Sequence, residues 1–143
     1  MAAAKHPMFR RIDHIGVIVD NLAEARRWME AFGLPLRRSV DVPERQVHGE
    51  FYACGDLDIE LIEIGNPEER RRRLGGGKRA RIEHIAVEVD DLGTALARVA
   101  ALGGRTTAPT PRQTPDSLNY WTTEETTGGI SYQLVQRLPK TTG

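Results

Sequence analysis

Hydrophobic and polar residues alternate in two short stretches of the chain, residues 12–19 and 82–89. In both stretches, β-branched residues occupy every second position, which is the period of a β-strand with one buried face. These residues are Ile15, Val17, Val19, Ile85, Val87 and Val89. Each stretch is followed by apolar residues three or four positions apart, a spacing that indicates an amphipathic helix. A strand followed by a helix is therefore predicted at both places.

The two stretches belong to an internal repeat. Residues 12–36 align without a gap with residues 82–106, and ten of the 25 aligned positions are identical. A repeat of this kind predicts one folding unit used twice. Three further strands are predicted after each helix, at about 36–42, 46–54 and 57–64 in the first copy and about 105–109, 118–124 and 129–136 in the second. The predicted fold class is therefore α+β, with two tandem βαβββ modules that form a cupped mixed sheet with helices outside.

A basic segment, NPEERRRRLGGGKRA, separates the two copies. Asn66 is a good helix cap, Pro67 suits the first helical position, and three glycines follow where the helix would end. We expect module one at about 10–65, a basic linker at 66–80 and module two at about 81–137. The length of 143 residues is that of one ordinary domain, so residues 1–143 are predicted to form a single domain.

Charge and cysteine content narrow the possible functions. Lys and Arg total 20, as do Asp and Glu, so the net charge does not favour nucleic acid or a membrane surface as a partner. Cys54 is the single cysteine, which excludes an internal disulfide and a zinc-thiolate site. No stretch approaches the roughly 18 apolar residues of a membrane span, and the N-terminus lacks the apolar run of a signal peptide. A soluble, cytoplasmic protein is the expectation.

Two histidines stand at equivalent positions of the repeat. His14 and His84 both lie on the face opposite the β-branched residues. Two positions after each histidine, on the same face, a small residue leaves room beside the ring: Gly16 in the first copy and Ala86 in the second. Paired histidines in such positions are candidate metal ligands, although structural, hydrogen-bonded histidines are the alternative. Two other histidines, His6 and His48, have no such counterpart and are expected to face solvent.

The segments DHIGV, IELIE, EHIAVEVDDL and TGGISYQLV resemble the vicinal oxygen chelate (glyoxalase/bleomycin resistance/dioxygenase) superfamily. Within it, the chain is most similar to the methylmalonyl-CoA epimerases. The resemblance implies that the first and last strands of each module supply one metal ligand apiece. These ligands would be His14, Glu60, His84 and Gln133. A donor set without thiolate suits cobalt, nickel, zinc, manganese or iron, and the sequence does not distinguish among them.

Gln133 departs from the family pattern, in which this position is usually a glutamate that both binds metal and moves a proton. A glutamine can bind metal through its carbonyl oxygen, but it cannot act as a base at neutral pH. Whether Gln133 is a ligand or abolishes the usual chemistry is left open by the sequence. Glu88, on the same strand face as His84, is one candidate for a replacement base.

The resemblance also implies a reaction and further site residues. VDVPERQV resembles a family segment that contains a catalytic glutamate, and Glu44 aligns with it, although its spacing alone would suggest a solvated loop carboxylate. The basic linker could attract the phosphates of coenzyme A, with Arg73, Lys78 and Arg79 as candidate substrate-binding residues. A solvated helix that keeps the protein soluble is the alternative.

The leading hypothesis is a metal-dependent epimerase or isomerase that acts on a small acid or acyl-CoA through a metal-stabilised enolate. The alternatives are a glyoxalase-like lyase, an iron-dependent dioxygenase, or a non-catalytic small-molecule binding protein of the resistance type. A homodimer is expected from the resemblance alone.

Overall fold

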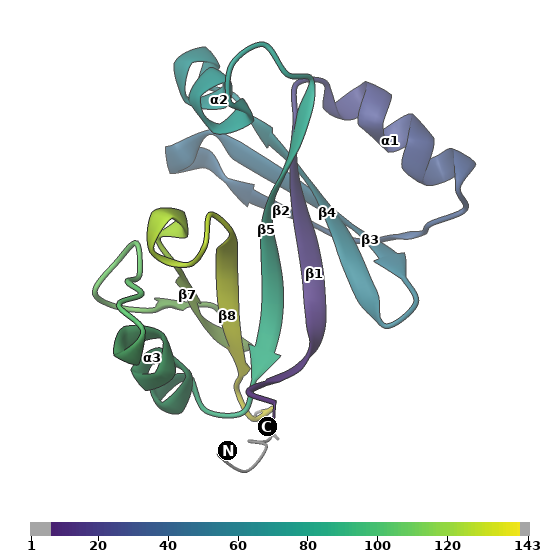
Figure 1. Ribbon diagram of the computed structural model, residues 1–143. Helices are drawn as coiled ribbons and strands as arrows, with labels where there is room; N and C mark the ends of the chain where they lie inside the picture. Colours follow the sequence, from purple (N-terminus) through teal and green to yellow (C-terminus); the bar gives the residue numbers. More distant parts are fainter. Residues whose placement is uncertain (1–6, 141–143) are drawn as a thin grey trace. The chain divides into compact units, whose positions relative to one another are not determined.

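The computed structural model describes residues 7–140 and confirms the two βαβββ modules (Figure 1). The first module comprises β1 (Phe9–Val19), α1 (Leu22–Ala31), β2 (Leu36–Val42), β3 (Val47–Cys54) and β4 (Leu57–Ile64). A helix in the linker, α2 (Pro67–Leu74), leads to the second module. This module comprises β5 (Ala80–Val89), α3 (Leu92–Ala101), β6 (Arg112–Gln113), β7 (Ser117–Trp121) and β8 (Ser131–Arg137). The α+β fold class predicted from the sequence is thus confirmed.

The contacts within the chain divide it into two compact units. The N-terminal unit is His14–His84, and the C-terminal unit comprises, among the described residues, 7–13 and 85–140. The strands that open the two modules are therefore shared: the first residues of β1 belong to the C-terminal unit, and the first residues of β5 belong to the N-terminal unit. The borders between the units fall inside these strands and not in the linker.

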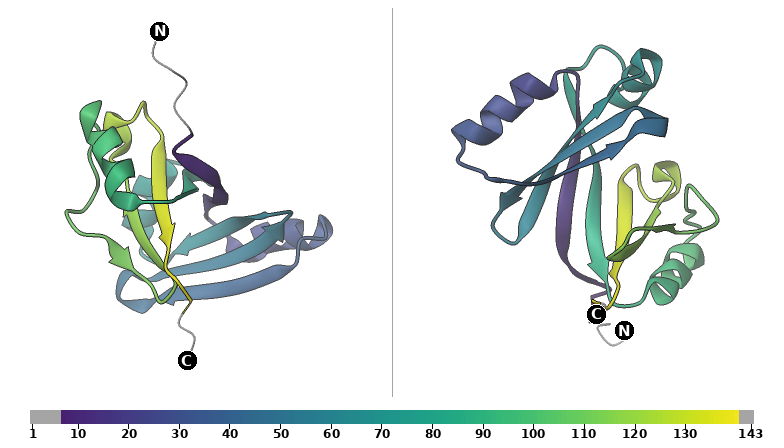
Figure 2. Two further views of the ribbon diagram at one scale, coloured as in Figure 1. Left: turned by 90° about the horizontal axis from the view of Figure 1, so that it is seen from below. Right: turned by 180° about the vertical axis from the view of Figure 1, so that it is seen from behind.

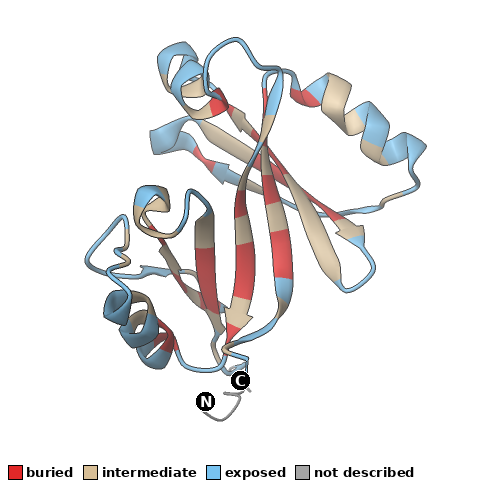
Figure 3. Ribbon diagram, in the orientation of Figure 1, coloured by how far each residue is buried: buried red, intermediate tan, exposed pale blue. Residues whose placement is uncertain are grey.

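In the N-terminal unit, the strands follow the order β2-β3-β4-β1, in which β1 and β4 are parallel and the other neighbours antiparallel. Helix α1 covers one face of this sheet. The core beneath it consists of Val19, Leu22, Tyr52 and Leu61. On the other face, Leu74 of α2 packs on a second core that consists of Ile18, Ile62 and Ile64. The C-terminal halves of β1 and β4 therefore carry buried residues on both faces of the sheet (Figure 3).

In the C-terminal unit, the strands follow the order β5-β8-β7-β6, and β8, β7 and β6 are antiparallel neighbours. Helix α3 packs against β8, and the views in Figure 2 show the helix along the strands of this unit. The core between them consists of Val87, Val89, Leu92, Ala95 and Leu134.

The helix boundaries agree with the signals in the sequence. The side chains of Asn21 and Asn66 accept hydrogen bonds from backbone N–H groups three residues later, as helix N-caps do. The last apolar position of each helical pattern, Phe32 or Leu102, lies directly after the helix and is exposed. None of the helices in the described part of the chain is long and apolar enough to span a membrane.

The strand expected at about 105–109 is wrong. The chain instead forms an isolated bridge between Thr106 and Thr122 and then the two-residue strand β6. Three prolines, Pro109, Pro111 and Pro115, surround this region, and a proline has no N–H group to donate to a strand ladder. Pairing is therefore limited to a few residues.

Candidate metal centre

Three neighbouring strands bring two imidazoles and one carboxylate together in the N-terminal unit. In the β1–β4 register Glu60 pairs with Gly16, so these two residues share one face of the sheet. His14 lies two residues before Gly16 on β1 and therefore on the same face. The Nε2 atoms of His14 and His84 lie 3.4 Å apart. The Oε2 atom of Glu60 lies 3.3 Å from Nε2 of His14 and 3.5 Å from Nε2 of His84. Three of the four ligands implied by the sequence are thus convergent.

These separations suit a divalent cation. Nitrogen and oxygen ligands bound tetrahedrally at about 2.1 Å from one ion lie about 3.4 Å from one another. Both histidines are buried, and the Glu60 side chain is only 16% exposed. The structure therefore holds a donor set of two imidazole nitrogens and one carboxylate oxygen, shielded from water, that fits the metal implied by the fold.

The carboxylate of this cluster stays ionised over a wide range of pH. Burial by itself raises the pKa of Glu60, but hydrogen bonds with His14 and His84 outweigh it and lower the pKa to about 2. Burial lowers the pKa of His84, but hydrogen bonds with Glu60 and Glu83 outweigh it, so that the net shift is upward. A metal ion competes with a proton for the ring of His84, and metal affinity is therefore expected to fall as the pH falls.

Two glycines provide the space that the donor groups fill. A Cβ atom at Gly16 would lie 2.2 Å from Cε1 and 2.4 Å from Nε2 of His84, too close for any side chain. A Cβ atom at Gly49, on β3, would lie 3.0 Å from Oε1 of Glu60. The room beside one imidazole was predicted from Gly16, whereas the role of Gly49 depends on strand register and was not predicted.

We expect Gly16→Ala to weaken metal binding, because the added methyl group would displace the ring of His84. Displacing a ligand should cost at least as much affinity as losing a ligand's hydrogen-bond partner, which is about 10–100-fold. Competition of the protein with a chromophoric chelator for Co²⁺ measures the change. Gly77→Ala is the matched control, since no atom lies within 4 Å of a Cβ there. Equal affinities of Gly16→Ala and wild type would refute this account of the site.

An aromatic and a basic residue flank the centre. The ring of Phe51, which pairs with Glu60 across β3 and β4, meets the His14 ring edge-on with centroids 5.2 Å apart. Arg38 pairs with Phe51 across β2 and β3, and its guanidinium lies 3.8 Å from the centroid of the Phe51 ring. Neither residue was predicted from the sequence. Phe51 buttresses His14, and Arg38 brings a positive charge to the same face.

Glu44, the predicted base, lies in a short 3₁₀ turn, Pro43–Arg45, and is exposed. The next residue after this turn, Gln46, has a left-handed backbone with φ 53°. Its carbonyl oxygen accepts a hydrogen bond of 2.7 Å from the N–H of Gly65. The turn that carries Glu44 is therefore held in place, and its carboxylate remains a predicted base.

Gln133, the fourth predicted ligand, is buried in the C-terminal unit. Its Nε2 group donates a hydrogen bond of 3.0 Å to Oδ1 of Asn119, which turns the carbonyl oxygen away from Asn119. Its role as a ligand stays a prediction. Glu88, the suggested replacement base, belongs to the same unit and lies 3.3 Å from the guanidinium of Arg11.

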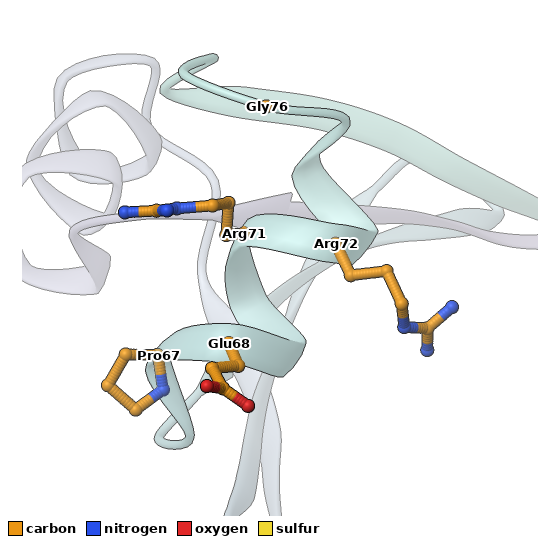
Figure 4. Close-up of a pocket in the computed structure, with 5 residues that line it drawn as sticks. All are labelled: Pro67, Glu68, Arg71, Arg72 and Gly76. Atoms are coloured by element: carbon orange, nitrogen blue, oxygen red, sulfur yellow. The ribbon is translucent and has the colours of Figure 1, made fainter.

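Two of the three predicted substrate-binding cations form ion pairs with other residues of the N-terminal unit. Arg73 binds Glu83 through two hydrogen bonds, and Arg79 binds Glu24, while Lys78 is exposed. A hollow on the surface of α2 is lined by Pro67, Glu68, Arg71, Arg72 and Gly76 (Figure 4). In that view the guanidinium groups of Arg71 and Arg72 point to opposite sides of the helix.

The expectation that His48 faces solvent is wrong. The ring is half-buried, with Nδ1 2.6 Å from Oδ1 of Asp41 and Nε2 3.4 Å from Oε2 of Glu50. Glu50 also accepts hydrogen bonds from Arg26 and Tyr52. The bond to Asp41 raises the pKa of His48. His48 is therefore held in a separate polar network, and His6 lies outside the described residues.

Comparison with known proteins places this geometry in a family. Residues 11–132 match the sequence profile of the Glyoxalase/Bleomycin resistance protein/Dioxygenase superfamily. An uncharacterized protein of Bacillus subtilis (strain 168), YqjC, is 37% identical over 54 residues, which are 37% of this chain and 39% of YqjC. The match thus spans about two fifths of that relative.

Solved structures share the fold. The methylmalonyl-CoA epimerase from Mycobacterium tuberculosis has a TM-score of 0.79 and 22% identity, over 97% of this chain and 94% of that chain. A variant of the Streptomyces coelicolor methylmalonyl-CoA epimerase in complex with 2-nitronate-propionyl-CoA has a TM-score of 0.77 and 20% identity, over 92% of this chain and 99% of that chain. At these identities the likeness shows the fold alone. The sequence-profile match over residues 11–132 shows that this chain belongs to the Glyoxalase/Bleomycin resistance protein/Dioxygenase superfamily.

Proposed function

We propose that the protein is a metal-dependent epimerase or isomerase of the methylmalonyl-CoA epimerase type, acting on a small acid or acyl-CoA. The observation that carries the proposal is the buried cluster of His14, Glu60 and His84, whose donor atoms lie within 4.8 Å of one another. Likeness in fold to epimerases supports the type of reaction. The positive charge of Arg38, which stacks on the ring of Phe51 next to His14, supports an anionic substrate.

Epimerisation beside a thioester requires that a weakly acidic proton be taken from carbon and returned to the opposite face. A divalent ion held by His14, Glu60 and His84 would supply a Lewis acid for the two oxygens on which the enolate charge develops. The protein must then provide a group that moves the proton. Glu44 is our proposed base, since a carboxylate can accept a proton and its side chain is exposed to an incoming substrate.

Gln133 gives the proposal a specific consequence. If Gln133 stands where the family has its second acid-base glutamate, only one side of the substrate has a base, because an amide does not accept a proton at neutral pH. Proton removal and return by Glu44 would then occur mostly on one face. Exchange of the proton with solvent is therefore expected to be faster than inversion of the carbon.

The test is exchange of the α-proton of methylmalonyl-CoA in D₂O, followed by NMR. Cobalt-loaded protein is expected to catalyse exchange, treatment with a chelator to abolish it, and added Co²⁺ to restore it. The Gly16→Ala protein at the same Co²⁺ concentration is the matched control for the metal. Because it is expected to bind less Co²⁺, it should catalyse less exchange than wild type. Metal-loaded protein without exchange on this or other acyl-CoA esters would contradict the proposal.

One observation favours a second candidate. Two histidines and one carboxylate are also the ligand set of non-haem iron(II) oxygenases, and all three lie in the N-terminal unit. An iron-dependent dioxygenase would consume oxygen when loaded with iron(II) and given a catechol. Oxygen uptake without α-proton exchange would favour this function over the epimerase.

A further inference from the structure

The second nitrogen of His84 has a partner of its own. Its Nδ1 atom lies 3.3 Å from Oε1 of Glu83, the preceding residue on β5. A carboxylate at neutral pH only accepts hydrogen bonds, so Nδ1 carries the hydrogen in this contact. Glu60 faces Nε2 in the same way, at 3.5 Å, so in the metal-free ring two carboxylates compete for the hydrogen. An ion that takes up Glu60 would leave Glu83 as the acceptor, with the hydrogen on Nδ1 and the lone pair on Nε2. Glu83 thus favours the form of the ring that can bind a metal through Nε2.

Glu83 is itself held by an arginine from the linker helix. The Nε and Nη2 groups of Arg73 donate to Oε2 and Oε1 of Glu83 at 2.7 and 2.5 Å, the two-pronged geometry that suits guanidinium and carboxylate. Both side chains are mostly buried, with 25% and 17% of their surface exposed. Arg81 in turn donates to the backbone oxygen of Arg73. The carboxylate therefore has little freedom to leave the imidazole.

The other copy of the repeat shows a similar arrangement within the C-terminal unit. Asp13 directly precedes His14, as Glu83 precedes His84, and Asp13 is also buried. Asp13 pairs with Arg11 and with Arg137, the last residue of β8. An acid before each histidine, paired with an arginine distant from it in the sequence, is thus a repeated feature of the chain.

We propose that Arg73 and Glu83 are positioning residues for the metal centre, which hold His84 with Nε2 directed at the ion. This inference rests on the proposed function, because it assigns the ion to His14, Glu60 and His84. It also gives Arg73 a role other than the binding of substrate phosphates. Ligating histidines commonly donate their second N–H group to a carboxylate, and loss of that partner typically weakens metal binding about 10–100-fold.

The experiment compares Glu83→Leu, Glu83→Gln and Arg73→Met with wild type. Co²⁺ affinity is measured by chelator competition, and the tautomer of His84 by ¹⁵N NMR on metal-free protein at a pH where the ring is neutral. Arg72→Met is the matched control, since Arg72 binds Glu69 on the exposed side of the same helix. Melting temperatures of the metal-free proteins report any general loss of stability.

We expect the hydrogen of the neutral His84 ring to lie more on Nδ1 in wild type than in Glu83→Leu, in which Glu60 is the remaining carboxylate acceptor. Co²⁺ affinity should fall about 10–100-fold in Glu83→Leu and less in Arg73→Met. Glu83→Gln retains an acceptor and should recover part of the loss, and the control should stay within about twofold of wild type. A variant that combines Arg73→Met with Glu83→Leu should bind Co²⁺ no more weakly than Glu83→Leu alone, because Arg73 acts through Glu83.

An unchanged tautomer in Glu83→Leu would overturn the inference, even if Co²⁺ affinity fell together with the melting temperature. Unchanged affinity in both Glu83→Leu and Arg73→Met would overturn it while leaving the proposed function intact. A wild-type protein that binds no Co²⁺ would instead defeat the proposed function, and the tautomer measurement would still decide whether Glu83 orients His84.

Discussion

His14→Ala protein is expected to lose its bound divalent metal, whereas wild type should hold about one ion per chain. The variant removes one of three convergent donor atoms and leaves Glu60 and His84 facing an empty volume. Removing a ligand should cost more than the 10–100-fold that follows from loss of a ligand's hydrogen-bond partner, so affinity should fall by more than about 100-fold. Elemental analysis of protein prepared without a polyhistidine tag, and Co²⁺ titration, measure the loss.

His48→Ala is the matched control for this change. His48 lies in the same unit and is also partly buried, but its ring nitrogens face Asp41 and Glu50. Its metal content should equal that of wild type. Full metal content in His14→Ala, or a wild type that refuses added cobalt, nickel and zinc, would contradict the metal centre. The second result would favour a binding protein without a metal.

The two histidines could be predicted because a repeat makes their equivalence visible in the sequence. Strand periodicity also predicted that Gly16 leaves room beside His14, whereas the structure places Gly16 against the ring of His84. Glu60 came from resemblance to the family, and the β1–β4 register shows the physical reason: Glu60 pairs with Gly16. The shared strand face of His14 and Gly16 therefore follows from the two-residue period of a strand, and the place of Glu60 beside them follows from the pairing of β1 with β4.

Other parts of the site depend on distances that no local pattern encodes. Gly49 matters because β3 and β4 are aligned so that it lies beside the Glu60 side chain. Arg73 was assigned to substrate because the linker is rich in arginine, yet its partner, Glu83, lies ten residues later on a strand. The direction of α2 relative to β5 decides which arginine of the run meets this carboxylate. The excess of arginine in the linker predicted that this segment attracts anions, but it did not predict that the anion bound by Arg73 is the carboxylate of Glu83.

The prediction of strands failed for a similar reason in one place. Periodicity predicted strands where β-branched residues alternate, and β2 and β4 have the expected bounds. In the second copy, the same position of the module is rich in proline, and the repeat suggested a strand that the backbone could not pair. Equivalent positions of the repeat thus predicted the two histidines of the site correctly. They did not predict the strand at the edge of the sheet, where β6 lies.

Glu44→Gln is expected to lower metal-dependent α-proton exchange on methylmalonyl-CoA about 10²–10⁴-fold, the usual contribution of a general base. The amide keeps the size of the side chain but cannot accept the proton. Because Glu44 is exposed and its turn is held by the backbone of Gln46 and Gly65, the fold and the Co²⁺ affinity should not change. Exchange in D₂O, measured at saturating Co²⁺, isolates the loss of the base.

The matched control for Glu44→Gln is Glu30→Gln, which alters another exposed carboxylate in the same unit. Its exchange rate should equal that of wild type. If Glu44→Gln exchanges within about twofold of wild type, Glu44 is not the base, since a general base contributes at least about 100-fold. The rate of inversion of the carbon is measured together with the rate of proton exchange. Exchange much faster than inversion indicates a single base on one face of the substrate. Equal rates would require a second base, which Gln133 cannot be.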